Sequence, residues 1–180
     1  MTTTLNKIRE HRPCTAGWAT LLSSLGKTKA DDEPVEISYI VESNGIEDAI
    51  WCLRAVEGHD REIRLFAVFC ARQVQHLLTD QRSVEAIDVA ERYANGEATE
   101  KELWVAELAS AEAASYAASW TACAAACAAA WAARGPASDV AWAARDAAWA
   151  TAPMTTGAAQ EAALNAQEKE LLRICKECEK

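Results

Sequence analysis

The stretch Asp60 to Leu78 reads DREIRLFAVFCARQVQHLL and is the longest part of the chain dominated by large apolar residues. Spaced as on a helix, its apolar side chains form one continuous stripe. The members of that stripe are Ile63, Phe66, Cys70, Val74 and Leu77. The pattern predicts a helix over residues 60–78 that is buried at the centre of an all-α fold.

The opposite face of this helix mixes charge with apolar surface. It carries Arg61, Arg64, Arg72, Gln75 and His76, interleaved with Leu65, Val68 and Phe69. A helix that is apolar on both sides needs cover on both sides, so its cations should be at least partly enclosed. Enclosed cations need carboxylate partners or a ligand. One hypothesis is therefore a salt-bridge network with acidic residues drawn from Asp60, Glu62, Glu85, Asp88 and Glu91.

The second hypothesis is a partly enclosed cationic pocket on the same face. Guanidinium groups recognise phosphate in a bidentate geometry, so such a pocket suits a nucleotide-sized small molecule or an acidic partner loop. A histidine at the helix break before Asp60 could join it, and an indole could stand nearby. We predict six ligand-binding residues: Arg61, Arg64, Arg72, His76, His59 and Trp51.

Shorter helices are predicted on both sides of this stretch. One follows a cap by Thr3 or Thr4, and a second ends at Gly26. Ile46 to Val56 precedes the central helix and Ser83 to Tyr93 follows it, each with an apolar face at helical spacing.

Residues Pro34 to Ser43 carry conflicting signals. Their apolar residues alternate as in a strand and are rich in β-branched types. No second strand is evident for pairing, and Asn44-Gly45 is typical of a helix end. We interpret this segment as a short helix.

From Thr99 the sequence becomes rich in alanine. Thr99 to Glu102 forms a capping box, and no glycine or proline follows until Gly135-Pro136. This permits one helix of about thirty-five residues, roughly 50 Å long. A second Ala/Trp helix, capped by Ser138, should end near Pro153. A last helix should start at Thr155 or Thr156 and carry Leu164, Leu171, Leu172 and Ile174.

Tryptophan recurs in this half with a period of eleven residues, at Trp120, Trp131 and Trp142, and Ala-Trp-Ala-Ala-Arg occurs at residues 130–134 and 141–145. One interpretation is an antiparallel hairpin in which alanine lets the backbones approach and tryptophans fill the gaps. The other is a row of exposed tryptophans for stacking on bases or on a partner. The acidic surface and the usual burial of aromatic residues favour the first.

Together these elements predict a single all-helical domain over residues 1–180. Residues 1–97 form an N-terminal multi-helix lobe packed around the central buried helix, and residues 98–180 form long Ala/Trp-rich antiparallel helices with a C-terminal helix. A chain of 180 residues is long enough to bury a substantial core.

The net charge of −9 argues against binding long nucleic acid through phosphate neutralisation. The opening MTTTLNKIREHR lacks the apolar segment of a signal peptide, and charged residues interrupt the alanine-rich stretch, so no membrane span is expected. We therefore expect a cytoplasmic protein, in the host cytoplasm if a phage encodes it, whose seven cysteines are free thiols.

Groups for catalysis are scarce. The chain has three histidines, and the phosphate-binding loop, nucleophile-elbow and HExxH motifs are missing. One alternative is a catalytic pairing of Cys70 or Cys52 with His76 or His59. Cys70 lies in the apolar stripe, however, where a buried thiol is inert. Four thiols could bind zinc if the last helix folds back, at Cys123, Cys127, Cys175 and Cys178. We predict core packing for the first two of these, and no catalytic residue, cofactor or metal ligand.

Three segments of the sequence resemble a known family: GKTKADDEP at 26–34, ESNGIEDAIWCLRAVEGHDREIRLFAVFCARQVQHLLTDQRS at 42–83, and DVAERYANGEAT at 88–99. The family occurs in phages, prophages and bacteria, ends in variable Ala/Trp/Arg/Asp repeats, and is described as a family of immunity proteins. The resemblance covers most of residues 5–100, and the alanine-rich half matches in texture. Residues typical of it include Trp51, Arg54, His59, Asp60, Arg61, Glu62, Arg64, Arg72, Gln75 and His76.

What the resemblance implies is an all-helical, non-enzymatic protein that neutralises a cognate toxin or a host defence component. Our first functional hypothesis is therefore a binding inhibitor of a protein partner. The second is a sponge that sequesters a nucleotide-type signal in the Arg/His pocket, and the third is an enzyme that degrades such a signal. Long amphipathic helices and an Ala/Trp seam also predict a homo-oligomer, a dimer in the simplest case.

Overall fold

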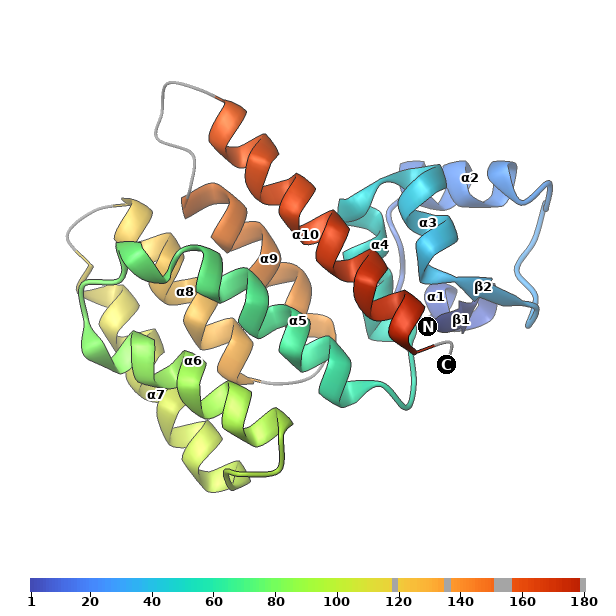
Figure 1. Cartoon of the computed structure of the whole chain (residues 1–180). Coiled ribbons are helices and arrows are strands. Elements are labelled where there is room, and N and C mark those ends of the chain that lie inside the picture. The colour runs from blue at the N-terminus through green and yellow to red at the C-terminus, as the bar shows by residue number, and fades with distance from the viewer. Residues whose placement is uncertain (118–119, 135–136, 151–156, 179–180) are drawn as a thin grey trace.

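The computed structural model describes residues 1–117, 120–134, 137–150 and 157–178. The fold is all-α, as the sequence predicted, with one small two-stranded sheet near the N-terminus (Figure 1). Several expectations concern positions outside these residues or side chains that are not described: the turn at Gly135-Pro136, the Trp120 ring, the Ser138 cap, the helix end near Pro153, and the start at Thr155 or Thr156.

The small sheet corrects the expectation for residues 34–43. Strand β1, Thr2–Thr4, pairs antiparallel with β2, Pro34–Glu36, with Thr3 opposite Val35. The helix α3 begins only after this pair, at Ile37, and spans Ile37–Asn44. The prediction of helix was wrong for the first three residues because their partner strand lies thirty or more positions away in sequence.

Helices α1 (Leu5–Glu10), α2 (Thr15–Ser24) and α4 (Ile46–Cys52) complete the N-terminal part, with the 3₁₀ turn η1 (Leu53–Ala55) extending α4. The Thr4 hydroxyl accepts a hydrogen bond from the Lys7 backbone N–H at 3.2 Å, so the predicted cap is confirmed. Asn44, at the end of α3, connects this helix to α2 and α4. Its Nδ2 donates to the Gly17 carbonyl of α2 at 2.8 Å and to Asp48 Oδ2 of α4 at 2.9 Å.

Helix α5 (Asp60–Gln73) is the central element, as predicted. It packs against α6, α8, α9 and α10, and Ile63, Phe66 and Cys70 are almost completely buried (Figure 1). The α-helix is shorter than expected because Val74 leaves helical geometry (φ −111°, ψ 7°), and the chain continues as the 3₁₀ turn η2 (Gln75–Leu77). Val74 itself remains fully buried.

Helix α6 spans Gln81–Ala94, α7 spans Glu100–Ser115 and α8 spans Trp120–Arg134. Gly96 adopts φ 77° after α6. The capping box of Thr99 with Glu102 starts α7, as predicted. The expected single helix of about thirty-five residues is wrong, because it divides into α7 and α8. Because the chain turns between them, α8 packs against both α7 and α6. In a single straight helix the second half could not pack against the first.

Helix α9 (Ala137–Ala150) packs along α8, and α10 (Gly157–Glu177) crosses α9, α5, α4 and α3. Alanines of both helices are buried, and their small side chains permit the close approach predicted for this pair. They include Ala125, Ala128, Ala129 and Ala132 of α8 and Ala143 and Ala147 of α9. On α10, Leu171 and Ile174 are buried, and Leu164 and Leu172 are partly buried against the same core.

Each of the two interpretations of the tryptophans on α8 and α9 is correct in part. The rings of Trp131 and Trp142 stack with centroids 6.1 Å apart and planes inclined by 29°. Trp131 is half-buried and its Nε1 donates to Asp146 at 3.1 Å, whereas Trp142 and Trp149 leave 42% and 44% of their surface exposed. The seam is therefore part core and part surface. No helix in the described ranges is long and apolar enough to cross a membrane.

Candidate functional site

The three predicted arginines of α5 all reach towards α6. Arg61 donates from Nη2 to Asn95 Oδ1 at 2.8 Å, and the Arg64 guanidinium lies 4.7 Å from the centroid of the Tyr93 ring. Arg72 reaches the middle of α6. These contacts connect two helices of the fold along most of their shared length.

Arg72 has the most complete set of protein partners. Its Nη2 lies 2.7 Å from Asp88 Oδ1 and 2.6 Å from Glu91 Oε2, and its Nη1 donates to Gln75 Oε1 at 2.8 Å. Burial opposes the charged form of Arg72, but the hydrogen bonds to Glu91 and Asp88 outweigh burial and raise its pKa. The salt-bridge hypothesis is confirmed for this residue.

Arg64 is the most enclosed of the three. Burial lowers its pKa, although nearby Tyr93 and Asp60 favour the charged form. Within the described part of the chain its buried Nη1 has no hydrogen-bond partner. The aromatic face of Tyr93 compensates in part, because a cation over a ring is stabilised by the ring quadrupole.

The structure does not bring the two predicted histidines together. His59 immediately precedes α5 and its Nδ1 lies 3.9 Å from Glu62 Oε2. His76 is exposed in η2, beyond the other end of the helix. The fourteen residues of α5 separate them by about 21 Å along the helix axis.

Trp51, the sixth predicted residue, lies on α4 with the guanidinium of Arg54 4.3 Å from its ring centroid. It lines a cavity against α2 and α3 and another against α9 and α10. The walls of these two cavities, among the residues that the structure describes, contain none of the five other predicted residues. Ligand binding by all six residues at one place stays a prediction, and their arrangement favours separate roles.

Reasoning from sequence missed an exposed apolar surface on α7. Trp104, Val105 and Leu108 expose 59%, 51% and 47% of their surface, and Ala111 is exposed one turn further on. We call these four residues the α7 surface. The signal was available, because α7 also buries Leu103, Ala106 and Ala113 on its other side and is thus apolar on two faces.

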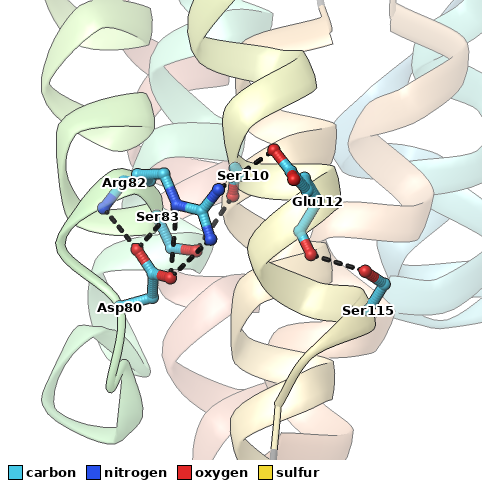
Figure 2. A network of polar contacts seen from close by, with 6 residues as sticks. All are labelled: Asp80, Arg82, Ser83, Ser110, Glu112 and Ser115. Atoms are coloured by element: carbon cyan, nitrogen blue, oxygen red, sulfur yellow. Dashed lines mark hydrogen bonds and ion pairs between the residues drawn. The ribbon is translucent and has the colours of Figure 1, made fainter.

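The orientation of α7 is fixed by polar contacts with α6 (Figure 2). Arg82 donates from Nη1 to Glu112 Oε2 at 3.0 Å and pairs through Nη2 with Asp80 Oδ2 at 2.8 Å. Beneath this pair the buried Ser110 hydroxyl is hydrogen-bonded to Ser83 Oγ at 3.2 Å and to the Ala126 carbonyl at 3.1 Å. These bonds hold one face of α7 against α6 and α8, so the α7 surface faces outwards.

A cavity of about 480 Å³ adjoins the α7 surface, between α6 and α7. Val105 belongs to both, and the walls combine apolar side chains such as Val89 with the charged groups of Arg82, Glu85 and Lys101. Such a hollow beside exposed apolar side chains is the arrangement in which partner side chains become buried at protein interfaces.

The seven cysteines are free thiols. Burial raises the pKa of Cys52 to about 12 and also raises the pKa of Cys70, which is consistent with the inert role predicted for Cys70. Burial, together with neighbouring Cys123, raises the pKa of Cys127 to about 11. Among the described residues no group of three or more His, Cys, Asp or Glu side chains could hold a metal ion.

Comparison of the chain with protein-family models, with curated proteins and with solved structures gives no match.

Proposed function

We propose that this protein is a non-enzymatic binding protein that neutralises a protein partner, and that the α7 surface is where the partner docks. The observation that carries the proposal is the exposure of Trp104, Val105 and Leu108 on consecutive turns of one helix. Contiguous apolar patches on a folded protein mark interaction sites, and tryptophan is enriched among the residues that dominate interface energies.

Charge indicates the chemistry of the partner. The chain carries a net charge of −9, and α7 itself has four glutamates against the single cation of Lys101. Two of those glutamates pair with arginines of α6, Glu102 with Arg92 and Glu112 with Arg82. We therefore expect a partner with an apolar patch bordered by basic side chains, because opposite potentials steer association and exclude other partners.

The resemblance to immunity proteins supplies the biological class of partner, a cognate toxin or a component of host defence against phages. A partner that buries Trp104 and Leu108 in its complex with this protein would be inhibited by binding alone, without a catalysed reaction. A direct test expresses the protein in a panel of bacterial strains, each with one toxin or one antiphage defence system, and scores growth or phage plating.

Two matched variants make this test specific to the α7 surface. Trp104→Glu/Leu108→Glu places two charges one turn apart on α7, and Ala158→Glu/Ala162→Glu places two charges at the same spacing on exposed positions of α10. We expect the wild type and the α10 variant to rescue at least one strain and the α7 variant to fail there. The same score for both variants on every strain would overturn the proposal.

The predicted homo-oligomer is examined by the same variants. A mass of 19.5 kDa measured by light scattering would identify a monomer and leave the α7 surface available to a different protein. A dimer that dissociates in Trp104→Glu/Leu108→Glu, and not in the α10 variant, would assign the surface to a second copy and overturn the assignment to a partner.

A further inference from the structure

The cavity of about 480 Å³ beside the α7 surface is a groove along two helices. All the described residues that line it belong to α6 or α7, and four of the eight are exposed. The two helices run antiparallel, because ion pairs join Arg82 to Glu112 (Figure 2) and Arg92 to Glu102. The hollow is therefore open to solvent along the length of this helix pair.

Two residues of the groove carry charges without a partner inside the fold. Glu85 of α6 and Lys101 of α7 are exposed, and neither forms an ion pair or a side-chain hydrogen bond with another residue that the structure describes. The antiparallel pairing places Glu85 level with about residue 109 of α7. That level is eight positions from Lys101, or roughly 12 Å along the axis. An available anion and an available cation thus stand about two helical turns apart.

The surface between these two charges is apolar. Val89 of α6 and Val105 of α7 are level with each other, and Ala106 and Ala109 continue the same surface along α7. Val105 leaves 51% of its surface in water, so covering it removes apolar area from solvent. The groove therefore presents an apolar floor with one charge of each sign at its two ends.

The other side of the same helix pair shows which secondary structure fits between these helices. Helix α8 packs against both α6 and α7, and the buried Ser110 hydroxyl reaches the Ala126 carbonyl of α8 at 3.1 Å. Ser110 and its partner Ser83, on the side of α8, do not line the groove. Two packed helices present a groove on each side, and the side-chain ridges of a third helix fit into either. The outer groove is thus suited to an α-helix, as the inner one is.

We propose that this groove receives a short amphipathic helix of the protein partner. The helix places a basic side chain opposite Glu85, an apolar side chain against Val89 and Val105, and an acidic side chain opposite Lys101. Residues i, i+4 and about i+7 of a helix share one face and span roughly 10 Å, so they match this spacing in either chain direction. The inference rests on the proposed function, because Val105 belongs to both the groove and the α7 surface.

A displayed library of helices tests the groove without knowledge of the partner. Each member is an alanine-based helix of about sixteen residues, long enough to be helical in isolation, with one face randomised. The library is selected on the immobilised full chain. We expect the enriched helices to carry one basic and one acidic residue about seven positions apart, with an apolar residue between them. No enrichment, or enrichment without this pair of charges, would overturn the proposal.

Charge exchange then locates the selected helix. Glu85→Lys should weaken its binding about fivefold, because an attraction at the rim becomes a repulsion. Replacing the basic residue of the helix by glutamate should restore binding to this variant. Glu161→Lys is the control, since it reverses an exposed glutamate of α10 and should leave the affinity unchanged. Equal losses in the two variants, or no recovery after the exchange, would overturn the proposal.

Failure of this inference is distinguishable from failure of the proposed function. Loss of strain rescue in Trp104→Glu/Leu108→Glu, together with a failed charge exchange, would leave the partner on the α7 surface and remove the helix from the groove. A successful charge exchange, together with equal rescue by the α7 and α10 variants, would keep the groove as a helix-binding site and overturn the proposed function.

Discussion

Arg72 Nη2 lies 2.6 Å from Glu91 Oε2, and this ion pair joins the last turn of α5 to the last turn of α6. The same guanidinium nitrogen reaches Asp88 Oδ1 at 2.7 Å. Both partners come from the helix that also supports α7. The cationic face of the central helix thus acts first as a connection between helices.

Replacing Arg72 by methionine should therefore lower stability. The side chain is 32% exposed and its partners are half-exposed, so the loss should be about 1 kcal/mol and not the value of a fully buried pair. Arg173→Met is the matched control, because both pairs that Arg173 forms in the described part of the chain, with Glu170 and Glu177, lie inside α10. This variant should cost less than about 0.5 kcal/mol. Urea denaturation measures both.

The ligand hypothesis for Arg72 makes the opposite prediction. Cyclic and ADP-ribose-type nucleotides would raise the melting temperature of the wild type, and Arg72→Met would abolish that shift without lowering the stability of the free protein. Equal urea midpoints for Arg72→Met and Arg173→Met, together with such a shift, would contradict the structural role.

The cap of α6 should make stability depend on pH. Hydrogen bonds from Arg82 hold the pKa of Asp80 below its ordinary value of 3.8. Because the folded-state pKa is depressed, the contribution of Asp80 is complete above about pH 4 and is lost as pH falls through the lowered pKa. Asp80→Asn should be less stable than the wild type at about pH 7, and the difference should shrink below about pH 3.5. A difference that stays constant over this range would contradict the pairing.

Gly17 is required by a close approach and not by its backbone angles. A Cβ at this position would lie 2.5 Å from Asp48 Oδ2, and that oxygen is held by Asn44. Gly17→Ala should therefore destabilise the protein by about 1–3 kcal/mol. Gly157→Ala is the control, since no atom of the residues that the structure describes lies within 4 Å of its added Cβ and alanine favours the helix by up to about 1 kcal/mol. Thermal unfolding that ranks the two variants in the reverse order would contradict the packing at Asp48.

Thiol labelling should divide the cysteines by depth. Cys14 is exposed, whereas Cys70 is completely buried and burial raises the pKa of Cys52 to about 12. A disulfide reagent at about pH 8 should modify Cys14 at least about a hundredfold faster than the other two, which require local opening. The fast phase should disappear in Cys14→Ser. Rapid modification of Cys70 in the folded protein would show that the central helix is accessible.

The sequence predicted well those features that depend on short-range patterns. The buried stripe of Ile63, Phe66 and Cys70 follows from helical periodicity, and the Thr99–Glu102 capping box requires only residues three positions apart. These signals hold whatever the rest of the chain does.

Features that depend on distant partners were harder to predict. The sequence between Ser115 and Trp120 contains no glycine or proline, so the helix break there could not be predicted from it. The break depends on the packing of α8 on α7 and α6. The pairing of Thr3 with Val35 likewise needs both ends of the N-terminal segment in place. For Arg72 the sequence supplied the correct acidic candidates, but only the geometry chose Asp88 and Glu91 among them.

The α7 surface could have been found by the rule applied to residues 60–78. A helix with apolar side chains on two faces needs other elements to cover both. In the described structure the α7 face of Leu103 and Ala106 is covered by other helices, and the opposite face is exposed. Binding a partner would remove the exposed apolar side chains of Trp104 and Leu108 from water.

We propose that the binding of a protein partner takes place through this face. Its most direct measurement is a calorimetric titration of the partner identified by strain rescue against wild type, Trp104→Glu/Leu108→Glu and Ala158→Glu/Ala162→Glu. We expect a dissociation constant at least about a hundredfold larger for the α7 variant, and an unchanged constant for the α10 variant. Equal dissociation constants for all three proteins would contradict it.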